Sequence, residues 1–430
     1  MPQNAVAPLA GYHGVSMPTH KPSIAIQRLQ RVDRTLGWLV CAALQPWRLL
    51  RRLRRRGASA PVGNVLLIKF WGIGSLQLLT PAAQVLRERH AGARFTLLTL
   101  RANESFARGL EVFDEVRSFD SHATNWWTMA LRIVHLVRDL RASQYDIIYD
   151  FEFFTRFSAV VSFLASAKHS VGFCSSSTWR GKLHTADVTF NRYWHVARNF
   201  RALAGGENGA GIPFGEFVPY QISAEEQSSA SARLGVAGVG TRAYIVLNPN
   251  AGLLSLERRW SRANFASLAR QIREQTQLPI LLVGSKSEMD YTAGLRALVM
   301  DIEPERLVNL CGELSTGELC AVLKGARAVI TNDSGPMHLA AALGAPTLGL
   351  FGPETPLMYE PLGSQADYIY RPTICSPCIN VHQGKVATCI HDRPECLANI
   401  TVHDVWSWLN AQLGITSVAP RSALLRVVER

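Results

Sequence analysis

One stretch of 26 residues, TNDSGPMHLAAALGAPTLGLFGPETP at positions 331–356, constrains the fold of this chain more than any other. The apolar residues before it are typical of a buried parallel strand, and those after Pro336 favour a helix. Asp333 and Ser334 are suited to cap that helix, while Gly335 lets the backbone approach a ligand closely. Pro336 fits the first helical turn because the amide it lacks has no partner there. The stretch therefore predicts a strand, a tight turn and a helix at the carboxyl edge of a parallel sheet.

Such a turn is suited to bind an anion. The N–H groups at the start of a helix lie at the positive end of its dipole, and ligands of open α/β sheets bind outside the carboxyl ends of the strands. We expect a diphosphate on the turn formed by Ser334, Gly335, Pro336 and Met337, with His338 facing the same side. The plainer alternative is a capped helix with a satisfied, half-buried histidine.

Strands and helices alternate along two parts of the chain, separated by a glycine-rich region at 204–215 and a Ser/Ala/Gly run at 228–240. This rhythm predicts two parallel, doubly wound sheets with right-handed crossovers. In the first part we expect strands at 65–69, 95–100, 115–119 and 146–151, with helices at 78–89 and 129–141. In the second part we expect strands at 244–248, 279–283 and 345–352, with helices at 264–276, 316–324 and 337–343.

The basic residues are concentrated at one end of the chain. The net charge is +12, and residues 1–61 supply nine of these charges because Lys21 and nine arginines stand against one acid, Asp33. Residues 1–23 show no hydrophobic periodicity and are expected to be disordered. Residues 24–56 combine helical apolar spacing with an arginine cluster after Trp47, which suits a helix that lies on an anionic membrane surface.

We expect this basic arm to bind a membrane surface without crossing it. Its longest apolar run, residues 36–44, is far shorter than the roughly 18 residues that a span needs. No small-residue cleavage site marks a secretory signal. Nucleic acid fits less well because the arm lacks interleaved aromatic residues and the rest of the chain is nearly neutral. A cytoplasmic protein held peripherally on the inner membrane is expected, with a plain solvated or packing helix as the alternative.

The segment 331–356 resembles the signature of glycosyltransferase family 9, the heptosyltransferases that build the inner core of bacterial lipopolysaccharide. Asp333, Gly335 and His338 match its D-x-G-x-x-H core, and the helix and GxPT strand that follow also match. The resemblance covers residues 62–413 and implies the GT-B fold, two Rossmann-like domains that face a central cleft. It assigns 62–225 to an acceptor domain, 240–413 to a nucleotide-sugar donor domain and 414–430 to a tail.

The resemblance also implies an activity. It is the inverting transfer of a heptose-like sugar from a nucleotide-diphosphate donor to a lipid-linked or core oligosaccharide acceptor, without a metal or other cofactor. Asp333 and His338 would then position the donor sugar and phosphate. Two alternatives stay open: a non-catalytic GT-B scaffold that keeps the donor pocket, and a nucleotide-sugar epimerase of the same fold.

The family pattern is broken at one position that matters for catalysis. In IKFWGIGSLQLLTP, Ser75 stands where the family has the aspartate taken to be the general base. A serine cannot accept a proton at neutral pH without a base of its own. Asp150 and Glu152 alternate at the end of a later strand and can face the same side, so either could take over this role. The alternative is a carboxylate that only pairs with Arg156.

Cations near the expected cleft would stabilise the charge of the leaving diphosphate. Lys69 ends the first strand, and NPNAGLLSLERRW resembles the family's Pro-Gly-Ala…Lys-x-Trp stretch, whose basic residue contacts the donor phosphate. We assign that role to Arg259, with Arg258 as the other candidate and a surface arginine beside a packed Trp260 as the alternative. Glu288 resembles the family acid that accepts the ribose hydroxyls, with Lys286 and Asp290 as alternatives.

Four cysteines follow the signature segment with the spacing C-x2-C-x10-C-x6-C: Cys375, Cys378, Cys389 and Cys396. The first pair suits a zinc knuckle, but the second spacing is wide for its partner pair, so a structural metal site, free thiols and a redox-labile pair all stay open. Trp406 and Trp408 lie on an expected closing helix, Val402–Leu413, and are expected to be core residues.

Overall fold

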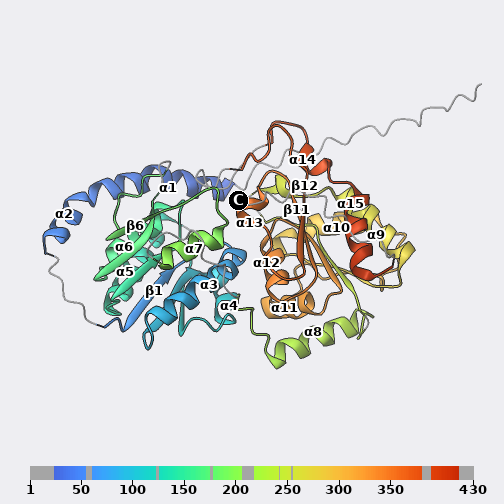
Figure 1. Cartoon of the computed structure of the whole chain (residues 1–430), viewed down its shortest axis with the longest axis horizontal. Coiled ribbons are helices and arrows are strands. Elements are labelled where there is room, and N and C mark those ends of the chain that lie inside the picture. The colour runs from blue at the N-terminus through green and yellow to red at the C-terminus, as the bar shows by residue number, and fades with distance from the viewer. Residues whose placement is uncertain are drawn as a thin grey trace, which may run out of the picture.

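The computed structural model of this chain describes residues 24–54, 61–122, 125–174, 178–205, 217–241, 243–252, 255–379 and 389–415. Residues 1–23, which are expected to be disordered, lie outside the described residues. Most of the glycine-rich region at 204–215 also lies outside them. Figure 1 shows two α/β halves side by side, with two helices of the N-terminal arm along the outer edge of the first half.

The N-terminal half is a six-stranded parallel sheet in the order β3-β2-β1-β4-β5-β6. Its strands are β1 (Asn64–Ile68), β2 (Arg94–Leu100), β3 (Glu115–Phe119), β4 (Ile147–Asp150), β5 (His169–Cys174) and β6 (Ala186–Thr189). Its helices are α3 (Ile73–Arg89), α4 (Glu104–Arg108), α5 (Trp126–Ala142), α6 (Arg156–Ala165) and α7 (Val196–Gly205), with a 3-10 turn, η1 (Arg101–Asn103).

Successive residues of the central strand β1 face opposite sides of this sheet, as the pleat requires. Val65 and Leu67 pack with α3 and α7, whereas Leu66 and Ile68 pack with α5 and α6. Because both faces are covered by helices, the strand is apolar throughout rather than alternating, which is why it could be recognised from the sequence.

The C-terminal half repeats this architecture in the order β12-β11-β10-β7-β8-β9, also parallel. Its strands are β7 (Ile245–Asn248), β8 (Ile280–Leu282), β9 (Leu307–Asn309), β10 (Ala328–Asn332), β11 (Thr347–Phe351) and β12 (Ala366–Tyr370). Its helices are α8 (Ala224–Val236), α9 (Arg262–Gln275), α10 (Met289–Leu298), α11 (Thr316–Lys324), α12 (Gly335–Ala342), α13 (Pro356–Tyr359), α14 (Glu395–Ala398) and α15 (Val402–Leu413). Two 3-10 turns, η2 (Leu256–Arg258) and η3 (Lys286–Glu288), complete it.

These two sheets confirm the expected α/β class with two doubly wound halves. Strands β5, β6, β9 and β12 extend the sheets beyond the strands that the sequence pattern identified. Trp406 and Trp408 are buried in α15, which packs on α9, so their expected place in the core is confirmed.

The Ser/Ala/Gly run at 228–240, which we expected to separate the halves, is mostly helical. Most of this stretch is the C-terminal part of α8, whose N-terminus has a capping box between Ser223 and Glu226. Ala230 and Leu234 are buried where α8 packs on α11. Serine and alanine are compatible with a helix once one face is buried and the N-terminus is capped.

The N-terminal arm forms two helices, α1 (Ile24–Ala43) and α2 (Gln45–Arg54), and α1 packs on α6. Cys41 is buried there among Ala159, Phe163 and Leu183. Within the part of the chain that the structure describes, no helix has the length and apolar content needed to span a bilayer.

Candidate active site

The turn after β10 has the predicted geometry but not the predicted caps. Ser334 is the N-cap of α12 and Pro336 lies in the first turn, yet no side chain caps the helix. The Ser334 hydroxyl instead accepts a hydrogen bond from the side-chain amide of Asn248, Nδ2, at 3.0 Å and lies 3.1 Å from Thr331 Oγ1. The expectation that Asp333 or Ser334 caps α12 is therefore wrong, because the Ser334 hydroxyl bonds to residues of β7 and β10 and the Asp333 carboxylate bonds to Arg258.

Asp333 is held by Arg258, from the loop that follows β7. Arg258 Nη1 donates to the backbone oxygen of Asp333 at 2.8 Å and to Oδ2 at 3.1 Å. Nη2 of the same guanidinium donates to Ala251 O at 2.5 Å. A mostly buried carboxylate and a mostly buried arginine thus fix two loops that follow adjacent strands, at the turn where the diphosphate is expected.

The next arginine points elsewhere. Arg259 lies over the ring of Tyr291, 3.9 Å from its centroid, and Arg259 Nη2 is 3.8 Å from Glu288 Oε1. Burial lowers the pKa of Arg259 below its ordinary value. Glu288 also accepts hydrogen bonds from the Ser285 hydroxyl at 2.7 Å and from Gly252 N at 3.1 Å. The structure therefore brings Arg259 to Glu288 and brings Arg258 to Asp333.

The start of α12 faces the other half of the molecule. A Cβ built on Gly335 would lie 2.7 Å from Ile73 Cγ1, and a Cβ built on Gly74 would lie 2.7 Å from His338 Cδ2. The first turns of α3 and α12 are thus in contact across the interface between the halves. The N-cap of α3, Gly72, has no side-chain cap either. Two helix N-termini without side-chain caps therefore meet, and their dipoles make this a positive region.

Glu152 lies at the same side of the N-terminal sheet, two residues beyond β4. Its Oε1 accepts from Lys69 Nζ at 2.7 Å, from Phe70 N at 2.7 Å and from Trp71 N at 3.1 Å. Both charged side chains are almost fully buried. Oε2 of Glu152 has no hydrogen-bond partner among the described residues. The idea that a strand-end carboxylate pairs with Arg156 is wrong, because Arg156 pairs with Asp33 at 3.7 Å.

Asp150, the other candidate carboxylate, is fully buried in a polar cluster. Oδ2 accepts from Arg180, from the Ser158 hydroxyl at 3.0 Å and from His184 Nε2 at 3.1 Å, and Oδ1 accepts from Glu152 N at 3.0 Å. Burial alone would raise its pKa, but the charge of Arg180 and the bond from His184 hold the pKa below its ordinary value. Both oxygens of Asp150 are engaged, whereas Oε2 of Glu152 is buried and has no hydrogen-bond partner among the described residues.

Two residues near this interface were not identified from the sequence. Tyr359, on α13, is buried, and its pKa is raised well above the ordinary value by burial and by the carboxylates of Glu354, Asp333 and Glu152. Glu354 is itself buried just beyond β11. Its place directly after the signature strand is the signal that could have identified it, because polar residues at the carboxyl ends of parallel strands line ligand sites.

His195 connects the two halves directly. Its Nε2 lies 3.2 Å from Glu360 O in the C-terminal half, and its Nδ1 accepts from Ala197 N at 3.2 Å. Acceptance at Nδ1 leaves the proton on Nε2, so the ring is neutral and donates to Glu360. Burial, together with the nearby charge of His338, lowers the pKa of His195 to about 3.

The cysteine cluster forms no disulfide. All eight cysteines lie in the described ranges and are free thiols. Burial raises the pKa of Cys378 to about 11, and the neighbouring Cys396, Cys375 and Cys389 contribute to this shift. No group of three or more His, Cys, Asp or Glu residues within the described ranges is arranged to hold a metal ion. The four-cysteine spacing therefore gains no support as a metal site.

Comparisons with known proteins agree with this arrangement. A sequence profile described as Glycosyltransferase family 9 (heptosyltransferase) matches residues 133–388. The chain is 28% identical over 291 residues to lipopolysaccharide heptosyltransferase 2 of Escherichia coli strain K12, which covers 65% of this chain and 78% of that protein.

Solved structures with the same fold include the Escherichia coli ADP-heptose lps heptosyltransferase II, with a TM-score of 0.66 and 21% identity, over 81% of this chain and 98% of that chain. A family 9 glycosyl transferase from Veillonella parvula DSM 2008 has a TM-score of 0.68 and 18% identity, over 84% of this chain and 100% of that chain. At these identities the structural likeness establishes the fold.

Proposed function

This chain belongs to glycosyltransferase family 9 and is a glycosyltransferase, and from that premise we propose that it transfers a heptose-like sugar from a nucleotide-diphosphate donor to a lipopolysaccharide core or related glycan acceptor. The similarity to an enzyme named for ADP-heptose makes ADP-heptose the donor to test first.

In the proposed reaction an acceptor hydroxyl attacks the anomeric carbon from the face opposite the diphosphate, so the configuration at that carbon inverts. A bond forms between the hydroxyl oxygen and the anomeric carbon while the bond from that carbon to the phosphate oxygen breaks. The hydroxyl proton passes to a carboxylate, and the electron pair of the broken bond leaves with the nucleoside diphosphate.

The C-terminal half would bind the donor. We assign the diphosphate to the first turn of α12, with the amides of Ser334 and Gly335 and the guanidinium of Arg258 as donors. The expected contribution of the Met337 amide is dropped, because Met337 N already donates to Ser334 O at 3.2 Å. Asp333 and His338 would position the sugar and phosphate. Arg258 is already held in place by two loop oxygens, Asp333 O and Ala251 O, so little rearrangement would accompany the growth of negative charge. Glu288, with Arg259 beside it, would accept the ribose hydroxyls.

The observation that carries this proposal is the environment of Glu152. Three donors hold Oε1, including the Lys69 ammonium, and Oε2 has no partner among the described residues. A carboxylate fixed through one oxygen can present the other to an acceptor hydroxyl in a defined direction. Glu152 would thus replace the acid that is absent at Ser75, and Asp150 would support it by accepting from its backbone N–H.

Turnover of ADP-heptose on a core oligosaccharide acceptor tests the proposal. We expect Glu152→Gln to lower kcat by about 10²-fold or more, the range for loss of a general base, and Ser75→Ala to leave it nearly unchanged. Thermal unfolding of each variant separates a catalytic effect from loss of fold, because Glu152→Gln leaves Lys69 without its charged partner. Wild-type protein that binds ADP but transfers no sugar from any common nucleotide sugar would instead support the scaffold alternative.

The acceptor and its location belong to the same proposal. Nine of the twelve net positive charges lie in residues 1–61, which favours the cytoplasmic face of the inner membrane, where a lipid-linked acceptor and anionic lipids occur. Deletion of residues 1–61 is expected to weaken binding to anionic vesicles. Unchanged vesicle binding would count against a membrane role for the arm.

A further inference from the structure

The outer face of the N-terminal arm exposes an unusual number of large apolar side chains. On α1 and α2 these side chains are between 49% and 61% exposed: Val32, Leu36, Leu39, Trp47, Leu49 and Leu50. Leaving such a face in water is unfavourable, because apolar surface gains free energy when it is removed from water. Single exposed apolar residues are ordinary, but a contiguous set marks an interaction surface.

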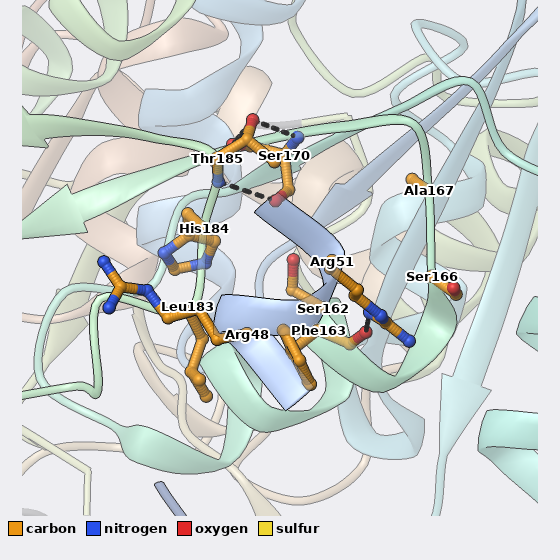
Figure 2. Close-up of a pocket in the computed structure, with 10 residues that line it drawn as sticks. All are labelled: Arg48, Arg51, Ser162, Phe163, Ser166, Ala167, Ser170, Leu183, His184 and Thr185. Carbon is orange, nitrogen blue, oxygen red and sulfur yellow. Dashed lines mark hydrogen bonds between the residues drawn. The ribbon is translucent and has the colours of Figure 1, made fainter. Parts of the chain in front are cut away.

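This exposure does not result from a detached arm, because the arm is fixed to both ends of α6. At the N-terminus of α6, Asp33 accepts from Arg156 N at 2.9 Å and from Phe157 N at 3.0 Å. Near its C-terminus, Arg51 donates to Phe163 O at 2.6 Å and lies over the Phe163 ring (Figure 2). An acid at the start of a helix and a base at its end both match the helix dipole, so the arm has a defined orientation.

Helix α5 presents a second apolar stripe on the other side of α6. Trp126, Trp127, Leu131 and Val134 are 60% to 64% exposed, and the last three follow helical spacing along one side. Helices α5 and α6 cover the same face of the N-terminal sheet, and α1 packs on α6. Helix α6 therefore contacts both α1 and α5, and each of these two helices exposes large apolar side chains.

The exposed charges of α1 and α5 are mostly positive. Arg31 and Arg34 on α1 and Arg138 and Arg141 on α5 are exposed. The only acid of the arm, Asp33, turns inward to cap α6, which leaves Asp139 of α5 as the exposed acid on these two helices. A second copy of the chain would bring two such basic faces together, whereas anionic headgroups complement them.

We propose that the outer faces of α1, α2 and α5 form one membrane-binding surface for anionic phospholipid bilayers. The tryptophan and leucine side chains enter the boundary between headgroups and acyl chains, and the arginines bind lipid phosphates. The proposal of this surface depends on the membrane location given under the proposed function. It goes beyond that location because α5, a helix of the N-terminal half, shares the contact with the arm. The bilayer thereby fixes the orientation of the N-terminal half.

Co-sedimentation of the full-length protein with phosphatidylcholine vesicles, with and without about one quarter phosphatidylglycerol, tests the surface. We expect Trp126→Ser/Trp127→Ser on α5 and Leu36→Ser/Leu39→Ser on α1 each to weaken binding to the anionic vesicles at least about tenfold, since each pair removes two large apolar contacts. The matched control is Val236→Ser/Met300→Ser, which changes two exposed apolar residues of the C-terminal half and should bind as the wild type does.

Three results would overturn the proposal: wild-type affinity in the α5 variant, equal binding to vesicles with and without phosphatidylglycerol, or a wild-type dimer that the α1 and α5 substitutions dissociate. Sedimentation velocity without vesicles detects the last outcome. Transfer to a water-soluble core fragment is measured on the same proteins. Retained transfer with lost vesicle binding supports the surface, whereas absent transfer in the wild type with intact vesicle binding counts against the proposed function alone.

Discussion

Gly74 and His338 come from different halves of the molecule, yet a methyl group added at Gly74 would lie 2.7 Å from His338 Cδ2 and 3.1 Å from Gly335 Cα. Glycine is required at this position by the close approach of two helix starts, not by its backbone angles. The contact also places the first turn of α3 beside the D-x-G-x-x-H residues. A change in the spacing between the halves would therefore also displace the turn where the donor is expected to bind.

Gly74→Ala should therefore hold the halves apart without unfolding either one. A Cβ at 2.7 Å from a ring carbon and close to backbone forces a shift, because real Cβ contacts are rarely below 3.0 Å. We expect kcat to fall about tenfold or more, since a misplacement near 1 Å is costly in a preorganised site. The measurement is steady-state transfer, with thermal unfolding as a check on the fold.

The matched control is Gly235→Ala, because nothing lies within 4 Å of an added Cβ there. Gly235 is in α8, where alanine is the better helix former, so this variant should be as active and at least as stable as the wild type. Full activity in Gly74→Ala would show that the contact between α3 and α12 is not needed for turnover.

Arg258→Ala should weaken the binding of ADP by about 10- to 100-fold and leave adenosine binding nearly unchanged, because a charged hydrogen bond contributes roughly 1.5–3 kcal/mol. Isothermal titration measures both ligands. Arg258→Lys keeps the charge beside Asp333 but loses the planar guanidinium. Its affinity for ADP should lie between that of the wild type and that of Arg258→Ala. Arg270→Ala removes an exposed arginine that pairs with Asp301 and serves as the control.

The same titration with Arg259→Ala tests the assignment made from the sequence pattern. That pattern assigns the phosphate contact to Arg259, and this assignment stays a prediction. In the structure Arg259 lies between Tyr291 and Glu288, so its loss should affect adenosine as much as ADP. The opposite result would be weaker binding of ADP but not of adenosine in Arg259→Ala, with unchanged binding of both ligands in Arg258→Ala. Arg259 would then bind the phosphate, and Arg258 would only hold the loops together.

Much of the fold could be predicted from the sequence because its elements are local and strongly patterned. Buried parallel strands such as β1 and β10 are continuous apolar runs, and the turn after β10 is specified by Gly335 and Pro336 within a few residues. Helices α11 and α15 begin and end at the predicted residues, and each begins with a capping box.

The site was harder to predict because its partners are far apart in the sequence. Asp150 looked like a second candidate base, and only the structure brings Arg180 and His184 onto its carboxylate. The choice between Arg258 and Arg259 depends on the direction in which each side chain points from the short 3-10 turn η2. Such choices are decided by tertiary contacts, which spacing along the chain does not encode.

Asp33→Ala should loosen the arm from the catalytic domain. The carboxylate caps α6 through two backbone N–H groups, so its loss should cost about 1–2 kcal/mol, the upper part of the range for N-cap replacements. Thermal unfolding and the rate of tryptic cleavage within residues 24–54 measure this effect. Thr35→Ala, at an exposed position two residues away, is the control. Equal cleavage rates in both variants would mean that the cap does not hold the arm.

The pH dependence of stability should reveal His195. Its folded-state pKa is about 3 against an ordinary value of 6.5, so between these values the unfolded chain binds a proton that the folded chain does not. Stability from this group is therefore fully present above pH 6.5 and is lost as the pH falls toward 3.

The loss approaches about 1.4 kcal/mol for each pH unit below the ordinary pKa, or about 2 kcal/mol on reaching about pH 5. His195→Gln keeps an N–H that can donate to Glu360 O but cannot titrate, so its unfolding free energy should fall less between about pH 7 and pH 5 than that of the wild type. Chemical denaturation at both pH values measures the two slopes, and the difference isolates this residue from the other titrating groups. If the unfolding free energies of the two proteins change equally with pH, His195 takes up its proton in the folded state. The bond from Nε2 to Glu360 O would then hold the halves together equally well with a charged ring.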